Sequence, residues 1–222
     1  MRSLVQPRVL KAAAVGAAVT SLASYPRLVL WTERPYQLWF LTLTLAWASF
    51  ILWSFVFAWH SKYTHRPVLV VRTNLRLWGF ATVAGLIGAS VLARYIDPVL
   101  RPLVPDDYPA TVESWLAMTL FLLAFDQLFL CLAPFAFFLR LSHRPGIAAS
   151  LTVLFGVFLV YLKARAWPGQ FSPAFILELF AWRVVAGFLS VSFFLKGGAL
   201  LTMGWIFLLQ LRHLIYIWTV AN

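Results

Sequence analysis

Four charged side chains interrupt long apolar stretches of the sequence: Asp126, Glu178, Arg183 and Arg212. A charge inside a membrane-spanning helix is costly, so such residues are candidates for function. The two acids and two bases cancel formally. At the rise of an α-helix, Arg183 and Arg212 each lie roughly 12–13 Å from the outer end of their span, and therefore at similar depths. We therefore expect one polar cluster in the outer half of a helical bundle.

Three neutral polar side chains extend this expected cluster through hydrogen bonds, so that it comprises Asp126, Gln127, Glu178, Arg183, Gln210, Arg212 and His213. One interpretation is a catalytic or ligand-binding site, in which Asp126, Glu178, Arg183 and His213 take part in chemistry. The other is a structural ion network that fixes the helix register. Glu178 and Arg183 are five residues apart on one helix, which is poor spacing for a pair. We expect Arg183 to pair with Asp126 or Glu178 across helices.

The composition defines the class of protein that holds these residues. Hydrophobic residues make up 62% of the 222 residues and charged ones 11%, whereas soluble domains are about 45–50% apolar and about 25% charged. Lipid must cover this excess, and a backbone in lipid satisfies its own hydrogen bonds only in helices or closed barrels. Long unbroken apolar runs favour helices. The sequence predicts an all-α polytopic transmembrane bundle that forms a single domain over residues 1–222.

Six or seven spans are expected, at about residues 11–31, 36–59, 77–97, 113–139, 147–162, 174–195 and 197–220. The first span is ambiguous, because its basic start and apolar run also resemble a signal peptide with a cleavage site at residues 21–23. We prefer an uncleaved helix, since small residues recur every fourth position in it. Such stripes let helices approach closely. They comprise Ala12, Gly16, Thr20 and Ser24 here, and Ala81, Gly85 and Ala89 in a later span.

The net charge of +11 is best explained by the membrane. The basic residues cluster in short loops and at span ends, where they set orientation and meet anionic lipid, so no nucleic-acid partner is expected. In a seven-span topology, ten Lys and Arg residues fall on the side of the N-terminus and six on the other side. This predicts a bacterial inner (plasma) membrane protein with a cytoplasmic N-terminus and an external C-terminus. The expected partners are the lipid bilayer and another membrane protein that contacts the small-residue faces.

Cofactors and metals are not expected. Cys131 is the single cysteine, so neither an intramolecular disulfide nor a cysteine-based metal site can form. His213 is the one histidine expected inside the bundle, which leaves no pair of axial ligands for haem. The sequence therefore predicts no bound cofactor and no metal.

From Thr111 onward the order of features follows a known pattern. A first helix carries Asp126-Gln127 and leads into a basic turn, a second contains Phe155, and a last pair of helices is joined by Lys196-Gly197-Gly198. This order resembles the CAAX-processing protease and bacteriocin-processing (CPBP) family, which has Glu-Glu-x-x-x-Arg, Phe-x-x-x-His and His-x-x-x-Asn helices. Asp126-Gln127 stand where the family has Glu-Glu, and Leu159 stands where it has the first histidine.

A second register of the same resemblance is possible. Glu178 and Arg183 keep the spacing of the family's first glutamate and arginine, and His213 follows Glu178 by 35 residues, but Leu179 replaces the second glutamate. In the family, a glutamate activates water while histidine and asparagine support the oxyanion. Neither register keeps the full set, so the resemblance implies a non-catalytic membrane scaffold or partner-binding protein. The alternatives are an active intramembrane endopeptidase with Asp126 or Glu178 as base, and a small transporter subunit with a buried charge network.

Overall fold

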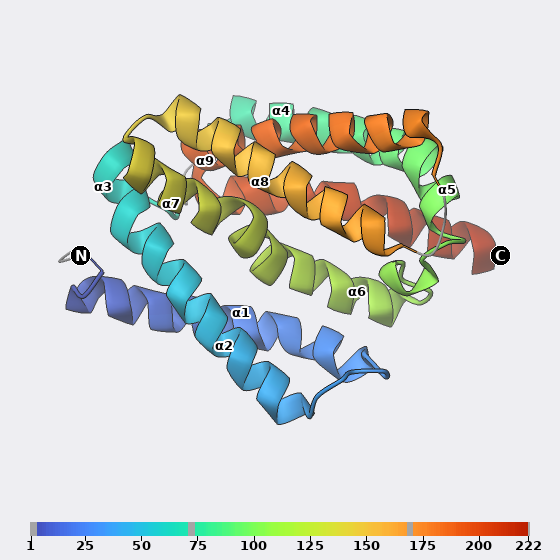
Figure 1. Ribbon diagram of the computed structural model, residues 1–222, viewed down its shortest axis with the longest axis horizontal. Helices are drawn as coiled ribbons and strands as arrows, with labels where there is room; N and C mark the ends of the chain where they lie inside the picture. Colours follow the sequence, from blue (N-terminus) through green and yellow to red (C-terminus); the bar gives the residue numbers. More distant parts are fainter. Residues whose placement is uncertain (1–3, 71–73, 168–170, 222) are drawn as a thin grey trace.

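Helices make up nearly all of the computed structural model, which describes residues 4–70, 74–167 and 171–221 and has no strand in these ranges. The expected all-α fold is thereby confirmed. The α-helices, shown in Figure 1, are α1 (Pro7–Leu30), α2 (Leu38–Phe55), α3 (Ser61–Thr64), α4 (Leu75–Val91), α5 (Asp97–Leu100), α6 (Val112–Phe121), α7 (Ala133–Ser142), α8 (Pro145–Ala166) and α9 (Pro173–Ala221).

Wide π turns join several of these helices into longer rods. They are η1 (Val56–His60), η2 (Leu92–Ile96), η4 (Leu122–Asp126) and η5 (Leu128–Leu132), and the short 3₁₀ turn η3 (Pro105–Asp107) lies in a loop. With the turns included, six helices are long and apolar enough to cross a membrane: Pro7–Leu30, Leu38–Thr64, Leu75–Leu100, Val112–Ser142, Pro145–Ala166 and Pro173–Val220. The protein therefore belongs to the class of multi-pass helical membrane proteins.

The last of these helices folds back on itself. At Gly198 the backbone has φ 70° and ψ −172°, which breaks α9 into two arms. The arms run in opposite directions in Figure 1, and Trp205 Nε1 on the second donates to Ser190 Oγ on the first at 3.2 Å. A straight helix of 48 residues would be about 72 Å long, far more than one bilayer crossing needs. The two arms cover the ranges of the spans expected at 174–195 and 197–220.

Gly198 is required at this turn for two reasons. A positive φ with extended ψ is accessible to glycine and strained for other residues. In addition, the Val68 carbonyl accepts a hydrogen bond from the Ala199 N–H at 2.9 Å. A Cβ at position 198 would lie 2.6 Å from that same oxygen. The loop before α4 thus lies directly against the α9 turn.

Both small-residue stripes pack inside the chain. On α1, Gly16 lies against the Trp53 ring of α2, and Thr20 accepts a hydrogen bond from Trp53 Nε1 at 3.0 Å. On α4, Ala81 is fully buried and Gly85 lies against Leu208 of the second α9 arm. These contacts between small residues and neighbouring helices stabilise the bundle itself.

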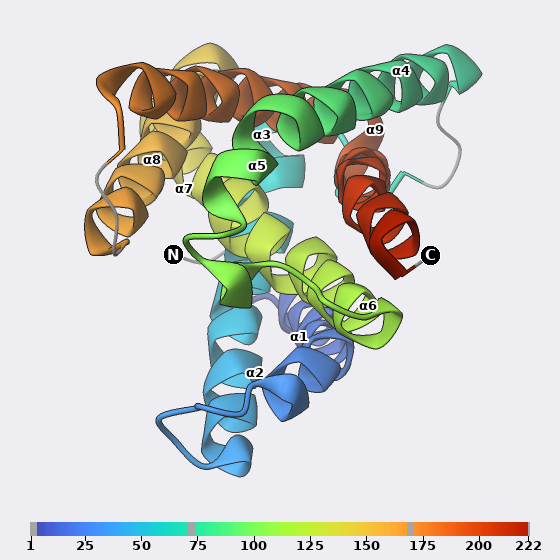
Figure 2. The same cartoon turned by 90° about the vertical axis from the view of Figure 1, so that its right-hand side faces the viewer.

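The two ends of the bundle differ in charge. One end is formed by the start of α1, by α3, by the α7–α8 turn and by the Gly198 turn, and we call it the basic end (Figure 1). The opposite end contains α5 and the segment 101–111 that joins it to α6, and we call it the connector end (Figure 1). The helical hairpin of α1 and α2 lies at one side of the bundle, against α6 (Figure 2).

Candidate functional site

The seven residues expected in one cluster lie in three separate places. Glu178 is exposed on the surface of α9, away from the other six. Asp126, Gln127 and Arg183 lie in the middle of the bundle. Gln210, Arg212 and His213 lie at the connector end on the second arm of α9, so the structure does not bring all seven side chains together.

The middle of the bundle holds a small polar group around Arg183. Asp126 is the last residue of the π turn η4, and Gln127 lies between η4 and η5. The guanidinium of Arg183 lies over Gly156 of α8, whose missing side chain leaves the necessary room. It makes no ion pair within 4.0 Å to any acid in the described part of the chain. The expected pairing with Asp126 or Glu178 is therefore wrong, because Arg183 turns toward α8 and Glu178 faces outward.

The neighbours of Arg183 are neutral, and the space between them is small. Gln127, Cys131, Thr152, Arg183 and Ser190 line a cavity of about 10 Å³, and we call them the central group. Gln127 Oε1 is buried without a hydrogen-bond partner among the described residues. A cavity of this size holds about one water molecule. The central group is polar but nearly filled by its own side chains.

A larger network of charges lies at the connector end, and we call it the connector cluster: Asp97, Arg101, Tyr108, Arg212 and His213. Arg212 Nε lies 2.9 Å from Asp97 Oδ2, and both side chains are largely buried, at 12% and 8% exposure. Arg212 also donates to the Leu209 carbonyl at 2.6 Å. Tyr108 donates to Asp97 Oδ1 at 3.3 Å. His213 Nδ1 lies 3.3 Å from Arg101 Nη2 and 4.0 Å from Asp97 Oδ2.

Aromatic rings surround the remaining cation of the connector cluster. The Arg101 guanidinium lies 3.4 Å above the centre of the Tyr216 ring and 4.7 Å above that of Tyr108, a favourable arrangement for a cation. Tyr108 meets His213 edge to face at 5.3 Å. Burial, followed by the charge of Asp97, raises the pKa of the Tyr108 hydroxyl above its usual range. The hydroxyl therefore stays protonated and donates to Asp97 at neutral pH.

Sequence reasoning missed the role of this segment. Asp97 and Arg101 are not among the residues that the sequence placed in a polar cluster, yet both contact the second arm of α9. The π turn η2 and the start of α5 turn Asp97 inward, where it is only 6% exposed. A usable signal was present, since Asp97 directly follows an apolar run and Arg101 lies four residues later on the same helical face.

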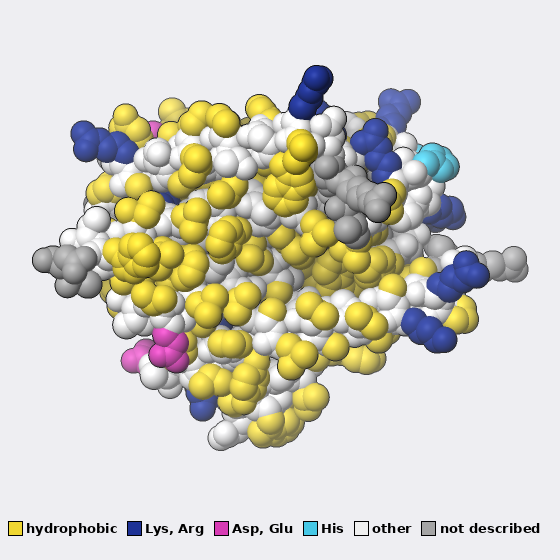
Figure 3. Space-filling model, turned by 180° about the vertical axis from the view of Figure 1, so that it is seen from behind, with side chains coloured by type: hydrophobic (Ala, Val, Ile, Leu, Met, Phe, Trp, Pro, Cys, Tyr) yellow, Lys and Arg dark blue, Asp and Glu magenta, His cyan; other side chains and the backbone are white. Residues whose placement is uncertain are grey.

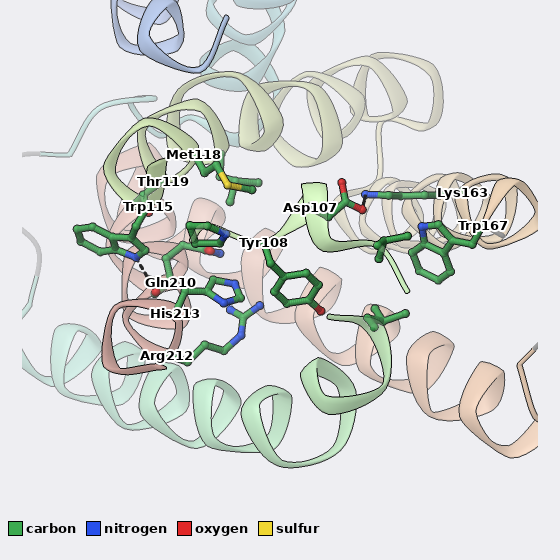
Figure 4. A pocket seen from close by; sticks show the side chains of 14 residues that line it. Asp107, Tyr108, Trp115, Met118, Thr119, Lys163, Trp167, Gln210, Arg212 and His213 are labelled. Carbon is green, nitrogen blue, oxygen red and sulfur yellow. Dashed lines mark hydrogen bonds and ion pairs between the residues drawn. The ribbon is translucent and has the colours of Figure 1, made fainter. Parts of the chain in front are cut away.

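A cavity of about 220 Å³ adjoins the connector cluster (Figure 4). Trp115, Met118 and Trp167 supply apolar walls, while Thr119, Lys163 and His213 supply polar ones. An exposed ion pair of 2.8 Å between Lys163 and Asp107 lies at its edge. Trp115 Nε1 donates to the Gln210 carbonyl at 2.8 Å.

Two of the residues that line this cavity each carry a buried polar atom without a hydrogen-bond partner in the described part of the chain. Trp167 Nε1 and Thr119 Oγ1 have no hydrogen-bond partner among the described residues. Buried polar groups usually do have partners, so each such exception needs an explanation. The cavity therefore has the features of a binding site for a group that can accept a hydrogen bond from Trp167.

The candidate catalytic residues expected of a protease lie apart in this arrangement. A general base needs a neighbour that supports the developing oxyanion. Asp126 does not line the cavity at the connector end, and His213 is held there by Arg101. No hydrogen bond or ion pair joins Asp126 to His213. Within the described ranges, no group of three His, Cys, Asp or Glu residues could hold a metal ion.

Comparison with protein-family models, curated proteins and solved structures finds no match. The fold and the two polar groups thus define the class of the protein, a multi-pass helical membrane protein with a divided polar interior, and its function has to be argued from them.

Proposed function

We propose that this chain is a non-catalytic, CPBP-like membrane protein that acts as a scaffold and binds a partner. The observation that carries the proposal is the composition of the central group. Gln127 stands where a second acid is expected, no carboxylate of the described residues lines the cavity of this group, and the guanidinium of Arg183 forms part of its wall. Room remains for about one water molecule, so a peptide bond has no place to bind within the central group.

The architecture supports a relationship to this family. The resemblance implies two final helices joined by Lys196-Gly197-Gly198, and α9 bends at Gly198 into two antiparallel arms. In the proposed topology the basic end lies in the cytoplasm of a bacterial cell, because basic loops are retained on that side. The connector end is then external, as is the C-terminus.

The cavity at the connector end is our candidate for the partner site. It is open beside the exposed Lys163–Asp107 ion pair, and such a pair contributes little to stability. A partner segment with a hydrogen-bond acceptor satisfies Trp167 Nε1, and an acidic group on it would compete with Asp107 for Lys163. The paired charges of the connector cluster hold the cavity walls in place.

A cleavage assay in reconstituted vesicles tests whether the protein lacks proteolytic activity. We expect no cleavage of prenylated or leader-peptide model substrates above that in empty vesicles, for the wild type and for Asp126→Asn and Glu178→Gln alike. Cleavage by the wild type that Asp126→Asn abolishes, with the helical content unchanged, would establish the endopeptidase alternative instead.

Photocrosslinking in cells tests the partner site. A photoreactive amino acid replaces Met118, which lines the cavity, or Leu116, which is exposed on the same helix α6. We expect one discrete crosslinked band from position 118 and none from position 116. Lys163→Glu should weaken that band several-fold by repelling the acidic group. The same band from both positions would contradict a partner seated in the cavity.

A further inference from the structure

A hydrophobic groove opens on the side of the bundle between α1, α6 and the second arm of α9. It encloses about 630 Å³, and we call it the lateral groove. Two polar side chains line it, Thr20 and Lys11. Thr20 accepts the hydrogen bond from Trp53, whereas Lys11 is exposed and forms no ion pair with any described acid. The side of the molecule seen in Figure 3 is largely hydrophobic, with most of its visible Lys and Arg along one edge.

The length and position of the groove match one leaflet of a bilayer. Along α1 it extends from Lys11 to Ala23, and the twelve helical steps between them span about 18 Å. Half of a hydrocarbon core is about 15 Å thick. Leu69 and Leu200 line the groove too, and they lie next to the Gly198 turn at the basic end. The groove therefore begins at one membrane surface and ends near the bilayer centre, like a single acyl chain.

The charge around the mouth of the groove selects the headgroup. Besides Lys11, the basic end carries Arg8, Lys62, Arg66 and Lys196. The seven acids of the sequence lie elsewhere, at positions 33, 97, 106, 107, 113, 126 and 178. A basic residue at a membrane surface attracts an anionic headgroup by about 1 kcal/mol. With no acid nearby to neutralise it, Lys11 is free to pair with a phosphate.

We propose that the lateral groove is a specific site for one anionic phospholipid, whose acyl chain lies along α1 and whose headgroup pairs with Lys11. The small side chains Ala12, Gly16 and Ala23 leave the space for the chain, and the Trp53 ring forms the floor beneath Gly16. The lipid then fills the gap between the α1–α2 hairpin and the rest of the bundle.

Native mass spectrometry of the full chain tests this site with added phosphatidylglycerol or phosphatidylcholine of identical acyl chains. We expect one tightly retained lipid and a preference of at least fivefold for phosphatidylglycerol. Lys11→Gln should reduce the preference about fivefold, because it removes one basic charge at the surface. Lys62→Gln, which removes a charge at the same end but outside the groove, should change it by less than twofold.

A second pair of variants tests the acyl-chain site. Ala12→Phe with Ala23→Phe fills the groove at both ends and should lower the retention of both lipids at least tenfold. Ala14→Phe is the matched control, since it lies on the exposed face of α1 outside the groove, and it should retain lipid like the wild type.

Three outcomes would overturn the proposal. Equal losses of preference in Lys11→Gln and Lys62→Gln would mean that the attraction is diffuse. Retention of lipid by the filled variant would place the lipid elsewhere. A stoichiometric polypeptide in place of lipid would mean that a partner helix occupies the groove. Lys11→Gln is a surface change that leaves the packing intact, so it decides the headgroup question even if the filled variant fails to fold.

Discussion

At the scale of single residues, the Asp97–Arg212 pair is the strongest charged contact in the described part of the chain. Breaking a buried pair by removing one partner costs about 3 kcal/mol or more, because the other charge is left unpaired. We expect Asp97→Asn or Arg212→Met alone to destabilise the protein by about that amount. The double variant should lose at least about 1 kcal/mol less than the sum. Unfolding in detergent with increasing dodecyl sulfate measures these differences.

The control for this pair is Glu178 with Arg183, whose pairing the sequence suggested and the structure does not contain. Glu178→Gln and Arg183→Met should be additive within about 0.5 kcal/mol. Strong coupling between Glu178 and Arg183, together with additivity between Asp97 and Arg212, would reverse our assignment of the charged contacts.

Tyr108 makes the stability of the connector cluster depend on pH. Its pKa is raised in the folded protein, so its contribution is present in full below the pKa of the unfolded chain, near 10. Above that pH the tyrosine of the unfolded chain ionises first, which lowers the free energy of the unfolded state. The contribution of Tyr108 to the stability of the folded protein therefore declines. The stability difference between wild type and Tyr108→Phe should be constant from pH 7 to about 9 and should shrink above about 10. Tyr36→Phe, at an exposed position, is the control and should show no such trend.

At the scale of the elements, the hairpin of α9 depends on Gly198. Gly198→Ala adds a Cβ close to the Val68 carbonyl and forces a strained backbone conformation, so we expect a loss of about 3 kcal/mol or a failure to fold. Gly79→Ala is the matched control, since nothing lies within 4 Å of the added Cβ in the middle of α4. It should stabilise the protein by up to about 1 kcal/mol. Equal effects of the two substitutions would mean that the turn does not need glycine.

At the scale of the whole molecule, the topology predicts opposite sides for the two ends. Ser61 lies at the basic end and Ala110 at the connector end, and both are exposed. The native Cys131 is buried and should stay unreactive. An impermeant thiol reagent outside intact cells should therefore label Ala110→Cys and not Ser61→Cys. The opposite pattern would reverse the orientation.

Much of the architecture could be predicted from the sequence, because the length of the apolar runs and the helix-breaking residues between them define helices in lipid. The expected spans differ from the helices by a few residues at most, mainly because caps extend the ends, such as Asn74 before α4 and the Thr111–Ser114 box before α6. The candidate site was harder to predict. Depth along a helix places a residue in one dimension only and does not say which way its side chain faces. Glu178 faces outward on α9, and the rotation that turned Asp97 inward follows the π turn η2, which has no clear sequence signal.

The π turns η4 and η5 also affect how this chain tolerates insertions and deletions. Each π turn holds about one residue more than an α-helical turn. Deleting a residue within η5 could restore regular geometry locally, yet it would rotate α7 by about 100° relative to α6. Phe135 and Leu139, both fully buried, would leave the core. A natural relative that is one residue shorter here would therefore need a compensating insertion before the turn at His143, so the length of this helix should vary less than its composition.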